Sequence, residues 1–117
     1  MIIVDEARNT IKNIAEKCME LDVIEKRKVD EGYCELVFRV ADLDKWEKII
    51  ADALGEAVKP SGVKPAGEDL SITDQYGGIA ANQTLFKREY EGGAVIAMLW
   101  PWDEEYVTLK VAHTVLS

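Results

Sequence analysis

His113 is the only histidine in the chain and the first residue to test for chemistry, because imidazole is the side chain that most readily exchanges protons near neutral pH. One histidine excludes a His–His metal site within a single chain. Glu89 is the obvious carboxylate partner, since both residues lie near the Gly92-Gly93 end of their predicted strands. A third predicted strand lies between them, however. The two residues are therefore two inter-strand spacings apart, a total of about 9.6 Å, which exceeds hydrogen-bond reach. We therefore expect His113 to be structural. It alternates in phase with apolar residues of its own strand, Val107, Leu109, Val111 and Val115.

The two cysteines, Cys18 and Cys34, are the next candidates for chemistry. Both fall on predicted core positions, and neither stands in a Cys-x-x-Cys pair or beside a basic cluster that would lower a thiol pKa. No serine lies in a Gly-x-Ser-x-Gly elbow, and the glycine pairs at 77–78 and 92–93 lack the spacing of a phosphate-binding loop. The sequence predicts no catalytic residue, no cofactor and no metal.

An acidic cluster beside two tryptophans is the most distinctive local feature. Calcium loops need alternating oxygen ligands over about a dozen residues, so we expect this cluster to be a solvated hairpin tip. Tryptophans on either side of Pro101 could instead stack on a sugar or an aromatic ligand. Trp100 is assigned to the core side, which leaves only Trp102 free. The weak surface candidates are therefore Trp102, Asp103, Glu104 and Glu105.

Composition limits the class of protein. The chain has 117 residues and a net charge of −8, which fits one acidic domain over residues 1–117 and disfavours nucleic acid and anionic membrane surfaces as partners. The apolar stretch Met1–Val4 is followed directly by Asp5-Glu6, so we do not expect a signal peptide. No apolar run reaches about 20 residues, so we expect no membrane-spanning helix. Free cysteines in a chain of this size indicate the cytoplasm.

The C-terminal third predicts an antiparallel meander of strands over 84–90, 94–100 and 106–115. Gly92-Gly93 forms the first turn, since paired glycines accept positive φ angles, and Pro101–Glu105 forms the second connection. The segment Ala94–Trp100 is apolar on both faces and therefore belongs in the interior of a sheet.

The N-terminal half predicts two helices around a hairpin. Helices are expected over Asp5–Glu20 and Asp42–Leu54, and strands over Asp22–Val29 and Tyr33–Val40. The first strand is rich in lysine and arginine, which suits a sheet edge. On the first helix, charged residues occupy the side opposite the apolar stripe, namely Arg8, Lys12, Glu16 and Glu20.

A long connection, Glu56 to Asp69, follows the second helix and is interpreted as a crossover to the far edge of the sheet, with a functional lid as the alternative. Leu70–Thr73 is a possible short strand. The predicted fold is therefore α+β: an antiparallel sheet of about five or six strands with two helices on one face, in the order α-β-β-α-(loop)-β-β-β.

The sheet face opposite the helices is predicted to be exposed. We expect the helices to cover Ala94, Ile96, Met98, Trp100, Val107, Leu109, Val111 and Val115. The other face is too aromatic and aliphatic to be left in water, which is typical of an interaction site. Its candidate interface or ligand-binding residues are Phe86, Arg88, Tyr90, Val95, Leu99, Tyr106 and Lys110.

Two function classes remain open. The first is a protein-interaction module that docks this face to a second copy, most simply as a homodimer, or to another protein. The second is a small-molecule-binding domain or small enzyme in which Arg88 and Lys110 anchor an acidic ligand between Tyr90 and Tyr106. The sequence favours the first class, because no nucleophile–base pair and no metal-ligand set survives the tests above.

Overall fold

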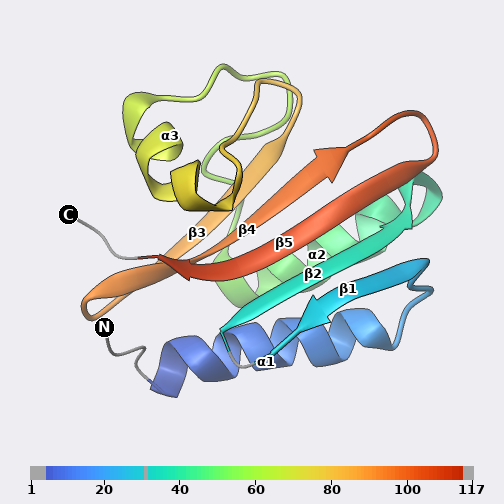
Figure 1. The fold of residues 1–117 in the computed structure, drawn as a ribbon, viewed down its shortest axis with the longest axis horizontal. Coiled ribbons are helices and arrows are strands. Elements are labelled where there is room, and N and C mark those ends of the chain that lie inside the picture. Colours follow the sequence, from blue (N-terminus) through green and yellow to red (C-terminus); the bar gives the residue numbers. More distant parts are fainter. Residues whose placement is uncertain (1–4, 31, 115–117) are drawn as a thin grey trace.

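A five-stranded antiparallel β-sheet forms the centre of the structure, a computed structural model that describes residues 5–30 and 32–114 (Figure 1). The strands lie in the order β1-β2-β5-β4-β3. Their bounds are β1 Glu25–Val29, β2 Tyr33–Arg39, β3 Thr84–Tyr90, β4 Gly93–Pro101 and β5 Tyr106–Thr114. The helices are α1 Asp5–Met19, α2 Leu43–Leu54 and α3 Gly67–Thr73, with 3₁₀ turns η1 at Val40–Asp42 and η2 at Asp74–Tyr76.

The predicted α+β class and the order of its elements are confirmed, with one helix more than expected in the described part of the chain. The long connection does carry the chain to the far edge strand, β3, and β1 is the opposite edge. Leu70–Thr73, a possible strand from the sequence, belongs instead to α3. Val115, the predicted end of the last strand, lies outside the described residues.

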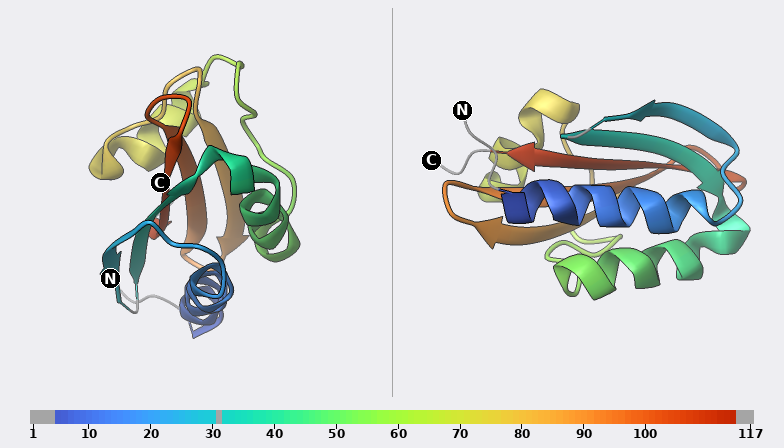
Figure 2. Two further views of the ribbon diagram at one scale, coloured as in Figure 1. Left: turned by 90° about the vertical axis from the view of Figure 1, so that its right-hand side faces the viewer. Right: turned by 90° about the horizontal axis from the view of Figure 1, so that it is seen from below.

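Helices α1 and α2 lie side by side on one face of the sheet, called the inner face here (Figure 2). Apolar residues at helical spacing put one stripe of each helix into the core. On α2 this stripe includes Trp46, whose ring stacks on Phe38 of β2 with centroids 4.1 Å apart and planes 7° apart. The buried stripe of α1 consists of Ala7, Ile11, Ile14, Ala15 and Cys18.

Helix α3 and the turn after it cover part of the opposite, outer face (Figure 2). Ile72 and Ile79 come from this segment, and they pack in a second apolar cluster with residues of the β3–β4 half of the sheet, Leu85, Ile96 and Met98. Because helices cover β4 from both sides, this strand is buried on both faces, as its continuous apolar sequence predicts.

The predicted assignment of β4 to the two faces is wrong. Ala97 lies opposite Val111 and Leu99 lies opposite Leu109, so these residues share the inner face with α1 and α2. Ile96, Met98 and Trp100 lie on the outer face instead. Both faces of β4 are apolar, and hydrophobicity alone therefore could not fix which one meets the helices.

The hairpin between β3 and β4 also differs from the prediction, because Tyr90 pairs with Gly93 and the turn consists of Glu91 and Gly92. Gly92 has the positive φ of +78° that the turn needs. Gly93 is a strand residue, and it is small for a different reason: a Cβ there would run into His113 and the carbonyl oxygen of Thr114.

A buried lysine ties the long connection to the sheet. Lys59 forms a β-bridge with Leu85 of β3, and its ammonium donates hydrogen bonds to the carbonyl oxygens of Pro60, Ala81 and Gln83. These acceptors use the three donors of the group, which is how a buried lysine avoids the penalty of an unpaired charge. Desolvation lowers the pKa of Lys59.

Candidate functional site

The residues predicted to form one exposed face are divided between the two sides of the sheet. Phe86, Val95 and Leu99 belong to the core beneath α1 and α2, where none is more than 3% exposed. The prediction that they form a surface patch is therefore corrected. Tyr106 and Lys110 do lie on the outer face, opposite Arg39 and Glu35 of β2.

Arg88 and Lys110 do not converge on one pocket, as the ligand-binding hypothesis required. Arg88 pairs with Val95 and donates from Nη1 to the carbonyl oxygen of Ala53 at the end of α2, 3.1 Å away. Its guanidinium carbon also lies 5.3 Å from the ring centroid of Tyr90. These contacts fix Arg88 on the inner side, whereas Lys110 is on the outer side.

The acidic cluster at residues 103–105 lies in the turn between β4 and β5, and Asp103 stabilises that turn. Asp103 Oδ1 accepts hydrogen bonds from the backbone N–H groups of Glu105 and Tyr106 at 2.7 and 3.0 Å. Within the described residues, no group of three or more histidine, cysteine, aspartate or glutamate side chains could hold a metal ion.

Trp102, predicted to be free, is half-exposed but folds back on the outer face. Its Nε1–H donates to the hydroxyl of Thr108, and the Arg27 guanidinium lies 5.0 Å from its ring centroid. Trp102 thus packs against Tyr106 and Thr108 of β5 and Arg27 of β1, which is a packing role.

His113 and the two cysteines occupy buried positions. Desolvation lowers the pKa of His113. Burial raises the pKa of Cys18 and of Cys34 to about 12, so both thiols are protonated and unreactive near neutral pH. The β4 strand separates His113 from Glu89, as the predicted meander required.

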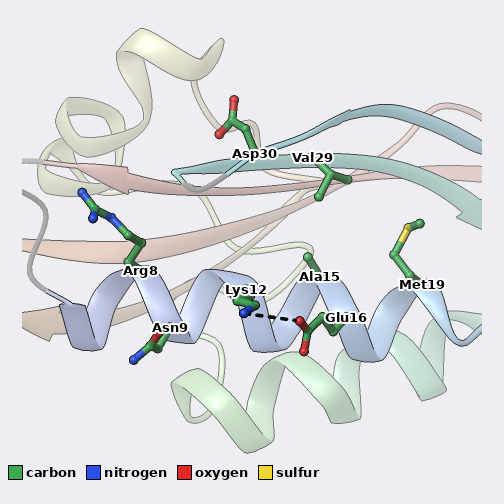
Figure 3. Close-up of a pocket in the computed structure, with 8 residues that line it drawn as sticks. All are labelled: Arg8, Asn9, Lys12, Ala15, Glu16, Met19, Val29 and Asp30. Atoms are coloured by element: carbon green, nitrogen blue, oxygen red, sulfur yellow. Dashed lines mark ion pairs between the residues drawn. The ribbon is translucent and has the colours of Figure 1, made fainter.

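A groove lies between α1 and the β1–β2 hairpin, with a volume of about 690 Å³ (Figure 3). It has a simple origin. Helix α1 packs against β2, β4 and β5 and α2 packs against β3 and β4, so neither helix packs closely on the edge strand β1. The lining residues are Arg8, Asn9, Lys12, Ala15, Glu16, Met19, Val29 and Asp30.

Two apolar side chains in the groove are accessible. Met19, the last residue of α1, and Val29 of β1 both point into the gap between the helix and the hairpin (Figure 3), and they are 41% and 42% exposed. Ile24, in the loop between these two elements, is exposed to a similar degree. Ile24 does not line the groove, but Met19 and Val29 share it, which distinguishes this pair from the scattered single apolar residues of an ordinary surface.

The charges along α1 are ordered. On the side that lines the groove, Arg8 and Lys12 lie in the first half and Glu16 lies in the second half, and Glu20 follows the end of the helix. Elsewhere on the helix the first turn also carries Asp5 and Glu6, and the last turn carries Lys17. Lys12 and Glu16 form an ion pair with 3.9 Å between Nζ and Oε1, and both side chains are more than 60% exposed. The part of α1 that lines the groove is therefore basic in its first half and acidic at Glu16 in its second half.

Sequence reasoning missed this groove as a site. It identified the charged side of α1 as solvated, and the available signal was the order of those charges together with Met19, an apolar residue outside the buried stripe.

The structure contains no helix long and apolar enough to cross a membrane within its described residues. No protein-family model, curated protein or solved structure matches the chain.

Proposed function

We propose that the chain is a homodimeric protein-interaction module whose two copies associate through the groove between α1 and β1. The observation that carries the proposal is the ordered charge along α1 beside an exposed apolar strip. This surface replaces the sheet face that the sequence suggested, because that face is covered by the helices.

Two-fold symmetry would pair the opposite charges of α1 across the interface. A two-fold axis perpendicular to α1 makes the two copies of this helix antiparallel, since each contact is then made twice with the roles exchanged. The basic first half of one helix then faces the acidic second half of the other. Lys12 of one copy lies near Glu16 of its partner, and Arg8 lies near Glu20.

Apolar burial would supply the affinity. Met19 and Val29 are exposed in the monomer, and their burial is favourable at about 25 cal/mol per Å² of apolar surface. A net charge of −8 opposes association between purely acidic surfaces, which favours a region that carries both positive and negative groups.

A charge-swap experiment tests the proposal. Lys12→Glu alone and Glu16→Lys alone each place like charges face to face at two symmetric contacts, so the dimer dissociation constant should rise about tenfold. The double variant Lys12→Glu/Glu16→Lys restores opposite charges and should restore the dimer. Sedimentation velocity over a range of protein concentrations measures all four proteins.

A matched control is available on α2. Lys48 and Asp52 form an exposed ion pair with the same i, i+4 spacing at 3.4 Å, away from the groove. Lys48→Glu and Asp52→Lys should leave dimerisation unchanged. If the α1 single variants dimerise as tightly as the parent, the groove is not the interface.

A further inference from the structure

A second hollow lies on the outer face, where the end of the β1–β2 hairpin meets the turn after α3. Its volume is about 490 Å³, within the range of sites that take small molecules. It lies on the other side of the sheet from the α1 groove, so it is independent of the proposed dimer. The residues that line it are Lys28, Tyr33, Gln75, Tyr76, Gly77 and Lys110.

The Lys110 ammonium is fixed at the base of this hollow. It donates a hydrogen bond to the carbonyl oxygen of Tyr76 at 3.0 Å, and it lies 3.5 Å from the ring centroid of Trp100. An ammonium group has three donors, so this arrangement leaves donors for a ligand. Desolvation by burial lowers the pKa of Lys110.

The carboxylate across the strand from Lys110 makes its hydrogen bonds with other groups, although its charge still acts on the ammonium and partly offsets the lowering of the pKa of Lys110 by burial. Glu35 lies opposite Lys110 in the strand register. Its carboxylate nevertheless accepts a hydrogen bond from the Tyr33 hydroxyl at 2.6 Å and another from Arg27 Nη1 at 3.3 Å. Burial alone would raise the pKa of Glu35, but these hydrogen bonds hold it below the ordinary value.

Aromatic rings form the wall of the hollow. Tyr33 and Tyr76 are stacked, with centroids 5.8 Å apart and planes 15° apart. Both hydroxyls are engaged, since Tyr76 donates to the carbonyl oxygen of His113 at 2.6 Å while Tyr33 donates to Glu35. The rings are therefore held in place, and their exposed surfaces are apolar.

A second cation stands at the rim. Lys28 is largely exposed, and its only recorded partner among the described carboxylates is Asp30 at 3.6 Å, a surface pair of little strength. Two ammonium groups beside a rigid aromatic wall fit a ligand with an anionic group and a flat apolar body. We infer that this hollow binds a small aromatic carboxylate, with Lys110 and Lys28 on the carboxylate and the tyrosine rings against the ligand ring.

The probes that separate the two parts of this inference are benzoate, benzamide and acetate. Benzoate has the ring and the charge, benzamide has the ring alone, and acetate has the charge alone. In ¹⁵N-resolved NMR titrations of the full chain, benzoate should shift the amides of Gln75, Gly77 and Lys110 in a saturable way. Benzamide and acetate should each bind at least about tenfold more weakly, because each lacks one set of contacts.

Variants locate the site. Lys110→Met and Lys28→Met keep the aliphatic stem and should each weaken benzoate binding by about tenfold. Lys48→Met on α2 is the matched control and should change nothing. Because Lys28 is exposed, its variant tests the site even if the Lys110 variant folds poorly.

Two results would overturn the inference. One is benzoate binding that is no stronger than benzamide or acetate binding, and the other is saturable benzoate shifts that the Lys28 and Lys110 variants leave unchanged. A monomeric parent would contradict the proposed dimer and leave this test unaffected.

Discussion

The imidazole of His113 occupies the space that a side chain at position 93 would need. A Cβ added to Gly93 would lie 2.6 Å from Nε2 of His113, closer than real Cβ contacts. Glycine at this strand position is thus required by the packing of β4 against β5, since it brings the two backbones and the imidazole together at the end of the sheet.

Gly93→Ala should therefore lower the free energy of unfolding by about 1–3 kcal/mol, as overpacking of a core does. Gly67→Ala is the control, because a Cβ there meets nothing within 4 Å and its φ is not positive. Urea denaturation measures both variants. Equal stability of the Gly93 and Gly67 variants would show that the imidazole moves aside at no cost.

Stability should fall as the pH falls through the histidine range. Desolvation lowers the pKa of His113 in the folded chain, so the unfolded chain, with an ordinary pKa of about 6.5, binds the proton more readily. The stability that neutral His113 provides is present above that pKa and is lost below it. Thermal melts between about pH 7.5 and pH 5.5 should show a smaller decrease for His113→Gln than for the parent. Parallel decreases would mean that other groups cause the pH dependence.

The three carbonyl oxygens around the Lys59 ammonium predict a structural role for this lysine. Lys59→Met fills a similar volume but leaves these buried acceptors without their donor, at a cost of about 1–3 kcal/mol. Lys64→Met, at an exposed position of the same connection, should be neutral. Denaturant melts that rank the two variants equally would contradict the role of Lys59 in holding the connection.

Leu99→Lys should unfold the chain. Leu99 is only 3% exposed, beneath α1 and α2, so the substitution forces a charge into an apolar core at a cost of several kcal/mol. Under the sheet-face hypothesis the same change would have altered only the assembly of a folded monomer. Far-UV circular dichroism distinguishes the two outcomes directly, and a native spectrum for the variant would contradict the observed strand register.

The fold was predictable where one physical signal acted alone. The stripes of α1 and α2, the charged edge strand β1 and the order of the elements follow from periodicity and charge. The register of β4 was not predictable in the same way, because Ala94–Trp100 is apolar on both faces and either face could have met α1 and α2.

The candidate sites were harder to predict, because they depend on which parts of the sheet the helices leave uncovered. Met19 and Val29 line one groove because neither α1 nor α2 packs closely on β1, and this relationship appears only once the sheet is assembled. Lys110 was identified from the sequence as an anchor for an acidic ligand. Its partners Lys28, Tyr33 and Tyr76 were missed, because α3 was not predicted on the outer face.

The measurement that tests the central proposal most directly is sedimentation equilibrium of the parent, of Met19→Lys and of Leu70→Lys. Met19 and Leu70 are similarly exposed helical residues, at 41% and 48%, but only Met19 lines the α1 groove. We expect the parent and the Leu70 variant to be dimers at micromolar concentration and the Met19 variant to be a folded monomer. A parent that is monomeric at these concentrations, or a Met19 variant that dimerises like the parent, would contradict dimerisation through this groove.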